Sequence, residues 1–189
     1  MRISTRAAWA TLGLLVCGCG SSPNTAYYTL AAVSGTVRQA SLGTIEVRRP
    51  GIAGYLDRAE ILGPWDGQRL QFSESACWGE PITSMIGRVL AEDLTDRLRG
   101  TIAFGASSVL SIQASRVVEI AIQKFDLGPD GQLHLHAFAS VRGAGQPSTR
   151  AVALSARPTT TETGAVVAAM SRLLGQLADE IASALLAAQ

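Results

Sequence analysis

The sequence predicts a single α/β domain in which a mixed, mostly antiparallel sheet is covered by two main amphipathic helices. Three observations support this fold class. Residues 82–99 and 166–185 carry apolar side chains at helical spacing, and two pairs of strand-like segments flank turn sequences. The order is strands, hairpin, helix, strands, hairpin, strand, helix, without the strand–helix alternation or the glycine fingerprint of a dinucleotide-binding fold.

The first 18 residues are predicted to be a lipoprotein signal peptide. Arg2 and Arg6 give a positive start, and the apolar run 7–16 is shorter than the roughly 20 residues that cross a bilayer. The four residues that end at Cys19 match a bacterial lipobox, in which a small residue precedes the lipidated cysteine. Cys17 fits less well because a valine precedes it. An ordinary cleaved secretory signal is the alternative.

Residues 19–26 are predicted to form a lipidated tether, and residues 27–189 the folded domain. Removal of the leader leaves 171 of the 189 residues, enough for one domain with a hydrophobic core. This part has 14 basic and 15 acidic residues, a formal charge of −1, which argues against a nucleic-acid-binding face. A tether of roughly eight residues reaches at most about 30 Å, so the domain should stay close to its membrane.

The first half of the domain is predicted to be mainly strand. The predicted strands are 27–30, 44–48, 60–62 and 69–72. A loop or short turn is expected over 51–58. The last two strands flank Gly63-Pro64-Trp65-Asp66-Gly67, whose composition is typical of a hairpin connection.

A helix is predicted from Ile82 to Arg99. Its apolar stripe consists of Met85, Ile86, Val89, Leu90, Leu94 and Leu98. Charged residues of the same segment, among them Asp93 and Arg97, are expected to lie largely on its other faces. The stripe therefore predicts one face packed on the core.

The second half repeats the pattern of strands and a helix. Predicted strands are 109–114, 117–126, 132–141 and 150–156, with Gly128-Pro129-Asp130-Gly131 as the turn of a hairpin. The last helix is predicted to begin at a capping box, Thr159 to Glu162. Its apolar stripe runs from Val166 to Leu185. Core packing is the main interpretation of this long stripe, and an oligomer contact along its far edge is the alternative.

No catalytic constellation emerges from the sequence. The chain lacks a G-x-S-x-G elbow, a Walker loop and an H-E-x-x-H motif. His134 and His136 share one face of a predicted strand, but no third ligand is evident nearby, so neither a metal nor a cofactor is predicted. Cys77 is the one cysteine that remains beyond the lipidation site, and it is expected to be buried and inert.

Two segments carry a family resemblance. They are Tyr55-Leu56-Asp57-Arg58 and, after a hairpin, Trp78-Gly79-Glu80-Pro81-Ile82 leading into a helix. This arrangement resembles the ABC-type transport auxiliary lipoprotein family, of which paraquat-inducible protein C is the best-known type. Ile82 replaces the leucine of the family pattern. The segment 27–30 and the terminal helix are also similar, so the resemblance spans the mature chain.

The resemblance implies a non-enzymatic accessory component of an MCE/ABC-type intermembrane lipid transport system. Such a protein would dock an MCE assembly at the periplasmic face of the outer membrane, with an MCE-domain protein and an ABC transporter complex as partners. Cys19 is followed by Gly20 rather than by an aspartate. In this respect the sequence resembles lipoproteins that are sorted to the outer membrane. The candidate site residues are Cys19 for lipidation and Tyr55, Leu56, Asp57, Arg58, Trp78, Glu80 and Pro81 for partner contact.

Each of these partner-contact residues also has a structural interpretation. Trp78 suits core packing, and Pro81 suits the first helical position. For the two segments as a set, structural and contact roles are equally supported by the sequence. Alternative functions are a periplasmic hydrolase or ligand-binding lipoprotein, and a structural cell-envelope lipoprotein.

Overall fold

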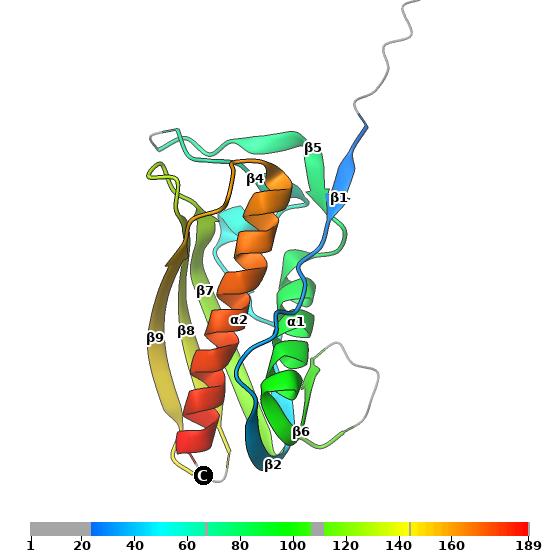
Figure 1. The fold of residues 1–189 in the computed structure, drawn as a ribbon, viewed down its shortest axis with the longest axis vertical. Coiled ribbons are helices and arrows are strands. Elements are labelled where there is room, and N and C mark those ends of the chain that lie inside the picture. Colours follow the sequence, from blue (N-terminus) through cyan, green and yellow to red (C-terminus); the bar gives the residue numbers. More distant parts are fainter. Residues whose placement is uncertain (1–23, 67, 107–111, 144, 189) are drawn as a thin grey trace, which may run out of the picture.

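Two helices, α1 (Ile82–Arg97) and α2 (Thr163–Ala187), lie side by side on one face of a six-stranded sheet (Figure 1). The computed structural model describes residues 24–66, 68–106, 112–143 and 145–188. α1 contacts the half of the sheet that holds β2 and β6, while α2 contacts β8 and β9. The predicted α/β class with two covering helices is confirmed.

The large sheet combines a parallel half with an antiparallel half. Its strands are β2 (Arg38–Val47), β3 (Gly51–Ile52), β6 (Leu98–Gly105), β7 (Arg116–Leu127), β8 (Leu133–Arg142) and β9 (Ser148–Ala156). The order is β6-β2-β7-β8-β9, with β3 beside β7. β2 is parallel to both of its neighbours, and β7, β8 and β9 form an antiparallel meander. The sheet is therefore mixed, as the sequence predicts.

A second sheet of three strands crosses the upper end of the helix pair in Figure 1. It consists of β1 (Ala26–Tyr28), β5 (Phe72–Trp78) and β4 (Glu60–Leu62), in the order β1-β5-β4. β1 is parallel to β5, and β4 is antiparallel to it. The short helix η1 (Gly54–Leu56) lies where the sequence predicts a loop or turn. This small sheet brings the two segments that carry the family resemblance together.

Residues 29–37, here called the strap, connect β1 to β2 along the groove between the two helices (Figure 1). Its backbone binds side chains from both sides. The Leu30 N–H donates to Met85 Sδ of α1 at 2.9 Å, and the Ala31 N–H donates to Ser171 Oγ of α2 at 3.2 Å. The strap therefore fixes the N-terminal strand to the helix layer.

The core lies between the helix layer and the large sheet. The predicted apolar stripes face it, because Leu90, Leu94 and Leu177 have no solvent exposure and Leu185 has almost none. Alternate residues of β7 and β8, such as Val118 and Leu135, are buried in the same way. Apolar residues repeat every 3.6 residues in the helices and every second residue in the strands, and these residues face the core as predicted.

Some element boundaries predicted from the sequence are wrong. α1 ends at Arg97, and Leu98, predicted to be its last apolar position, begins the unpredicted strand β6. Gly100 has a φ of 91°, which turns the chain sharply back toward β2. β2 begins at Arg38 instead of Thr44. Half of the predicted strand 109–114 lies outside the described residues, and the described half, 112–114, is not in a strand, so the prediction is wrong there.

α1 begins at Ile82 as predicted, but the start of α2 and the first hairpin differ from the prediction. α2 begins after Glu162, and no side chain caps it, so the capping box predicted from Thr159 is wrong. Thr160 Oγ1 instead accepts a hydrogen bond from the Glu162 N–H at 3.3 Å. In the first hairpin the second strand starts only at Phe72 and continues to Trp78. The second hairpin, β7 and β8, matches the prediction.

Candidate functional site

The two segments singled out by the sequence meet at one end of the small sheet. The Trp78 N–H donates to the Ala59 carbonyl at 2.7 Å, and the Gly79 N–H donates to the Tyr28 carbonyl at 2.9 Å. These bonds place the turn after η1 beside the turn before α1, with β1 on the other side of β5. Residues 55–58 and 78–81 are thus neighbours in space.

Between these turns is a surface hollow of about 370 Å³, here called the signature hollow. Its lining residues are Asp57, Arg58, Ala59, Trp78, Glu80, Pro81 and Ile82. Five of the seven residues proposed for partner contact are among them. Trp78 and Ile82 are buried and form an apolar floor, while Asp57, Arg58 and Pro81 are exposed around it. The hollow therefore has an apolar floor and a charged rim.

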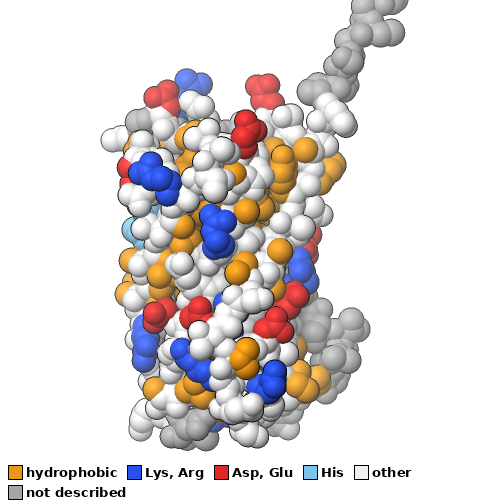
Figure 2. Space-filling model, viewed as in Figure 1, with side chains coloured by type: hydrophobic (Ala, Val, Ile, Leu, Met, Phe, Trp, Pro, Cys, Tyr) orange, Lys and Arg blue, Asp and Glu red, His pale blue; other side chains and the backbone are white. Residues whose placement is uncertain are grey.

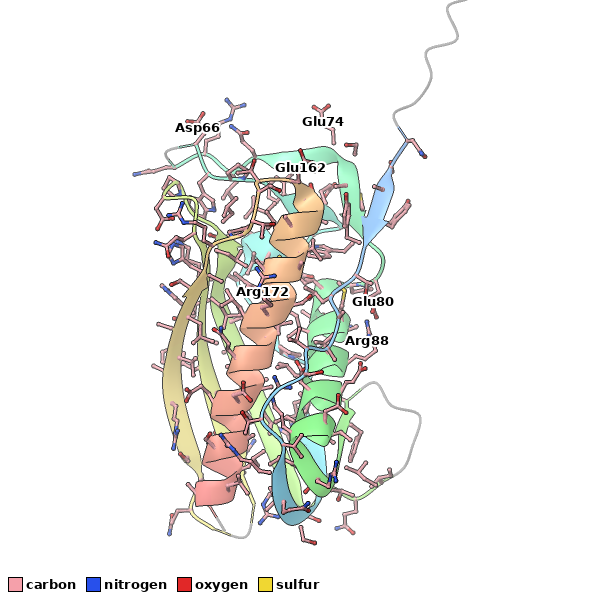
Figure 3. The ribbon with its side chains drawn as sticks, viewed as in Figure 1. Asp66, Glu74, Glu80, Arg88, Glu162 and Arg172 are labelled. Carbon is pink, nitrogen blue, oxygen red and sulfur yellow. The ribbon has the colours of Figure 1, made fainter. Side chains whose placement is uncertain are left out.

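The charges on the rim differ in how far they are paired. The Arg58 guanidinium lies 4.7 Å from the centre of the Phe72 ring, and its Nε is 3.4 Å from a Glu60 carboxylate oxygen. Glu80 forms a 2.7 Å ion pair with Arg88, and both side chains are labelled in Figure 3. Asp57 has neither an ion pair nor a side-chain hydrogen bond to any described residue. Its carboxylate is therefore free to receive a cation from a partner.

The remaining two residues, Tyr55 and Leu56, point away from the hollow. Leu56 belongs to the core. The Tyr55 hydroxyl donates to Asp126 Oδ2 at 2.5 Å, and Asp126 is only 3% exposed. Burial, together with this hydrogen bond, raises the pKa of Tyr55. The Tyr55 ring also meets Trp65 edge to face at 6.0 Å. Both residues therefore have structural roles.

Pro81 lies one position earlier than its structural interpretation predicts. It is the N-cap residue of α1, with a ψ of 127°, and Ile82 is the first helical residue. Its carbonyl accepts the Met85 N–H at 3.1 Å and so begins the helix ladder. Trp78, at 7% exposure, supports the core-packing interpretation while it also floors the hollow.

Comparison with protein families decides the class of this chain. A family model described as the ABC-type transport auxiliary lipoprotein component matches residues 28–182. The chain belongs to the ABC-type transport auxiliary lipoprotein family. This finding confirms the resemblance carried by the two segments. No curated protein matches the chain.

Two crystal structures share the fold of this auxiliary lipoprotein. One, of an uncharacterized protein, has a TM-score of 0.72 and 15% identity, and the match covers 86% of this chain and 99% of that one. The other, protein XCC0632 from Xanthomonas campestris, is assigned to the DUF330 family. Its TM-score is 0.66 at 17% identity, with 84% and 93% of the two chains covered. At these identities the likeness concerns the fold alone.

A buried charge cluster in this auxiliary lipoprotein is not predicted by the sequence analysis. Asp93 and Arg97, expected largely on the outer faces of α1, are almost completely buried. Arg97 binds Asp93 Oδ1 at 3.0 Å and Asp179 Oδ1 at 2.7 Å. The Val33 N–H of the strap donates to Asp93 Oδ1 at 2.9 Å. The four-residue spacing of Asp93 and Arg97 was the available signal, but such pairs usually lie at the surface.

The structure also gives the positions of the two histidines and of Cys77, which the sequence analysis considered as possible reactive or metal-binding residues. His134 and His136 share a strand face, as predicted, and His134 Nε2 lies 3.1 Å from Asp130 Oδ2. Within the described ranges no group of three metal-binding side chains comes together. Cys77, predicted to be buried, is partly exposed instead, because it points to the opposite face of β5 from Trp78.

The lipidation site Cys19, the leader and most of the tether lie outside the described residues. None of the helices in the described ranges has the length and apolar content needed to cross a membrane. The first described strand, β1, begins at Ala26. Ala26 is seven positions after Cys19, which corresponds to at most about 25 Å of extended chain.

Proposed function

We propose that this chain is a lipid-anchored, non-enzymatic accessory subunit of an MCE/ABC-type intermembrane lipid transport system. In this proposal it docks the MCE assembly at the periplasmic face of the outer membrane, and the signature hollow is the docking surface. One observation carries the assignment of the site. Residues from two segments about twenty positions apart, which hold the family resemblance, line a single hollow at the surface.

The chemistry of the hollow suits a protein partner. Its floor offers the buried indole of Trp78, and its rim offers Arg58 and the unpaired carboxylate of Asp57. Aromatic and arginine side chains commonly dominate binding energies at interfaces, and a charged rim favours the correct partner and speeds encounter. We therefore expect a partner segment that inserts an apolar side chain and presents a cation toward Asp57.

The position of the hollow supports docking near the membrane. It lies beside β1, whose Tyr28 faces Trp78 in the sheet register. Because the tether before β1 is short, lipidation of Cys19 would hold the hollow close to the bilayer. Gly20 after Cys19 supports the outer membrane as the location. Figure 2 shows Lys, Arg, Asp and Glu side chains interspersed over the helix-layer face, so the proposed anchor is the lipid rather than a basic surface.

The alternative functions, a hydrolase or a ligand-binding lipoprotein, would need a pocket with converging polar groups. The mainly apolar pocket beneath the small sheet is lined by the polar side chains of Tyr55, Glu60 and Asp126. Its free volume is about 20 Å³, which is about the space that one water molecule needs. This pocket is too small for a substrate in the structure, and it does not favour the alternative.

Binding measurements on the full lipidated chain in detergent test the docking proposal. We expect the chain to bind the periplasmic part of the MCE-domain protein from the same organism. Asp57→Arg should weaken this binding about tenfold, the equivalent of about 1.4 kcal/mol. Asp96→Arg is the matched control, since Asp96 is exposed on α1, away from the hollow. Asp57 has no ion pair or side-chain hydrogen bond among the described residues, and an unchanged melting temperature of Asp57→Arg would separate a loss of binding from a loss of folding.

Two results would contradict the proposal. A wild-type chain that binds no MCE protein but hydrolyses an ester, amide or glycosidic substrate would support the alternative function. Equal binding by the wild type and Asp57→Arg would show that the docking surface lies outside the signature hollow.

A further inference from the structure

The strand β9 forms an open edge of the large sheet. Its nine residues, Ser148–Ala156, pair with β8 in an unbroken register and contain no proline. Within the described ranges, the β9 backbone makes no hydrogen bond beyond those to β8. Long, regular edges of this kind readily accept another strand, and most proteins shorten, bend or cover them.

The other sheet edges are protected in these ways. β1 and β4, the edges of the small sheet, have three residues each. At the far edge of the large sheet, the backbone of Ala103 in β6 is hydrogen-bonded to the side chain of Thr95 in α1. Thr95 Oγ1 accepts the Ala103 N–H at 3.0 Å and lies 3.3 Å from the Ala103 carbonyl. β9 is therefore the one long edge without such protection among the described strands.

The sequence of β9 is complementary to itself when it runs antiparallel to a second copy centred on Val152. The facing pairs would be Ser148 with Ala156, Thr149 with Ser155, Arg150 with Leu154, Ala151 with Ala153, and Val152 with Val152. The hydroxyls of Thr149 and Ser155 would face each other, small residues would face small residues, and no two like charges would be opposed. We propose that two copies of this chain join their large sheets edge to edge through β9, around a two-fold axis at Val152.

The helix above β9 supports the same axis. α2 runs antiparallel to β9 (Figure 1), and Glu180 lies level with Arg150, 4.0 Å from its guanidinium. Val152 lies two residues after Arg150 on β9. This is a rise of about 6.6 Å along the strand, which corresponds to about four residues of α2. The axis therefore passes at the level of Gln176. Arg172 and Glu180 lie one helical turn to either side of it.

These two charges would complement each other across the axis. Arg172, Gln176 and Glu180 are all exposed on α2, and Arg172, labelled in Figure 3, has no ion pair with any described residue. The two-fold rotation would bring Arg172 of each copy toward Glu180 of the other. A two-fold interface repeats each contact twice. Charge complementarity thus favours a second copy, rather than an unrelated strand, as the occupant of the edge.

The proposed dimer is compatible with membrane anchoring and goes beyond the docking role. Its axis is perpendicular to the sheet, and the strap that leads to β1 lies on the helix layer in both copies (Figure 1). The rotation places β1 of the two copies at opposite ends of the helix layer, so both tethers reach one membrane when this layer faces it. The signature hollow lies away from β9 and stays open in each copy.

Site-directed crosslinking of the full chain in detergent tests the register. The background variant is Cys77→Ser, which leaves no cysteine beyond the lipidation site. In it, Val152→Cys should form a disulfide between copies, because facing Cα atoms lie about 4.5–5.5 Å apart. Thr149→Cys is the matched control. In the proposed register its two copies are six residues, about 20 Å, apart and should not crosslink.

Charge reversal tests the helix contact. Light scattering should give a dimer mass for the wild type and a shift toward monomer for Arg172→Glu, which faces Glu180 of the other copy. The double variant Arg172→Glu/Glu180→Arg should restore the dimer. A monomeric wild type, crosslinking at position 149 equal to that at 152, or no rescue by the double variant would each overturn the proposal.

Discussion

Arg97 on α1 donates a hydrogen bond from its Nε to Asp179 Oδ1 on α2 at 2.7 Å, although the arginine is only 2% exposed. Its remaining N–H groups bind Asp93 and the carbonyls of Val33 and Gly175, at 2.9–3.0 Å for the shortest contact to each. One guanidinium thus joins both helices and the strap. The strap is fixed to the helix layer through this residue.

We expect Arg97→Met to lower the free energy of unfolding by about 3–5 kcal/mol, because removal of one partner leaves a buried charge uncompensated. Asp93 is sensitive to this loss. Burial raises its pKa, and its Oδ2 has no hydrogen-bond partner among the described residues. Urea unfolding followed by circular dichroism measures the effect. Arg99→Met, at an exposed position, is the control and should change stability by less than about 0.5 kcal/mol.

Gly35→Ala should also destabilise the chain, through the same guanidinium. A Cβ at this position would lie 2.4 Å from the Arg97 Cζ, which the surrounding hydrogen bonds hold in place. Overpacking of this kind costs about 1–3 kcal/mol. Gly54→Ala is the matched control, since a Cβ there meets nothing within 4 Å. Equal melting temperatures for the two variants would show that the strap can move away from Arg97.

Tyr55→Phe should cost about 1–3 kcal/mol at neutral pH, because it leaves the buried Asp126 Oδ2 without its donor. The pKa of Tyr55 is raised above its ordinary value of 10.0 in the folded state. The stabilisation by the neutral hydroxyl is therefore complete below that pH and is lost as the pH rises above it. Unfolding experiments should show the difference between wild type and variant shrinking above about pH 10. A constant difference would contradict this assignment.

Leu90→Asp and Leu177→Asp should each unfold the domain or lower its stability by several kcal/mol. Both side chains are fully buried in the helix stripes, and an unpaired buried carboxylate costs as much as a large part of total stability. Ala168→Asp, at an exposed position of α2, should melt within a few degrees of the wild type. Thermal melts of the three variants compare these positions directly.

Cys19→Ala should abolish membrane association while the domain stays folded. The basis is the lipobox that ends at Cys19. Palmitate labelling and membrane fractionation give the measurement. If the variant still sediments with membranes in cells that lack the transport partner, the anchor lies elsewhere.

Local patterns in the sequence were sufficient for the fold class, both helices and the second hairpin. The spacing of Ile86, Leu90 and Leu94 needs only one turn of helix to be recognised, and Gly128–Gly131 encodes its turn within four residues. The same local rule failed at Leu98. Its spacing continues the helical stripe, but pairing with β2 draws it into a strand.

Motif positions in the sequence singled out both segments of the candidate site, and the tertiary structure shows which of their side chains line the hollow and which face inward. Asp57, Arg58, Glu80 and Pro81 line the signature hollow, whereas Tyr55 and Leu56 face inward. A motif gives residue identities and spacing, but the direction of each side chain depends on what packs beneath it.

The sequence by itself determined the family, the amphipathic helices and the predicted anchor, because each depends on residues that are close together in the chain. Only the tertiary structure decided the burial of Arg97 and the meeting of residues 55–58 with 78–81. Arg97 is buried because Val33 and Asp179, 64 and 82 positions away, supply its hydrogen bonds. A charged side chain can leave water only where partners replace its solvation, and those partners come together only when the chain has folded.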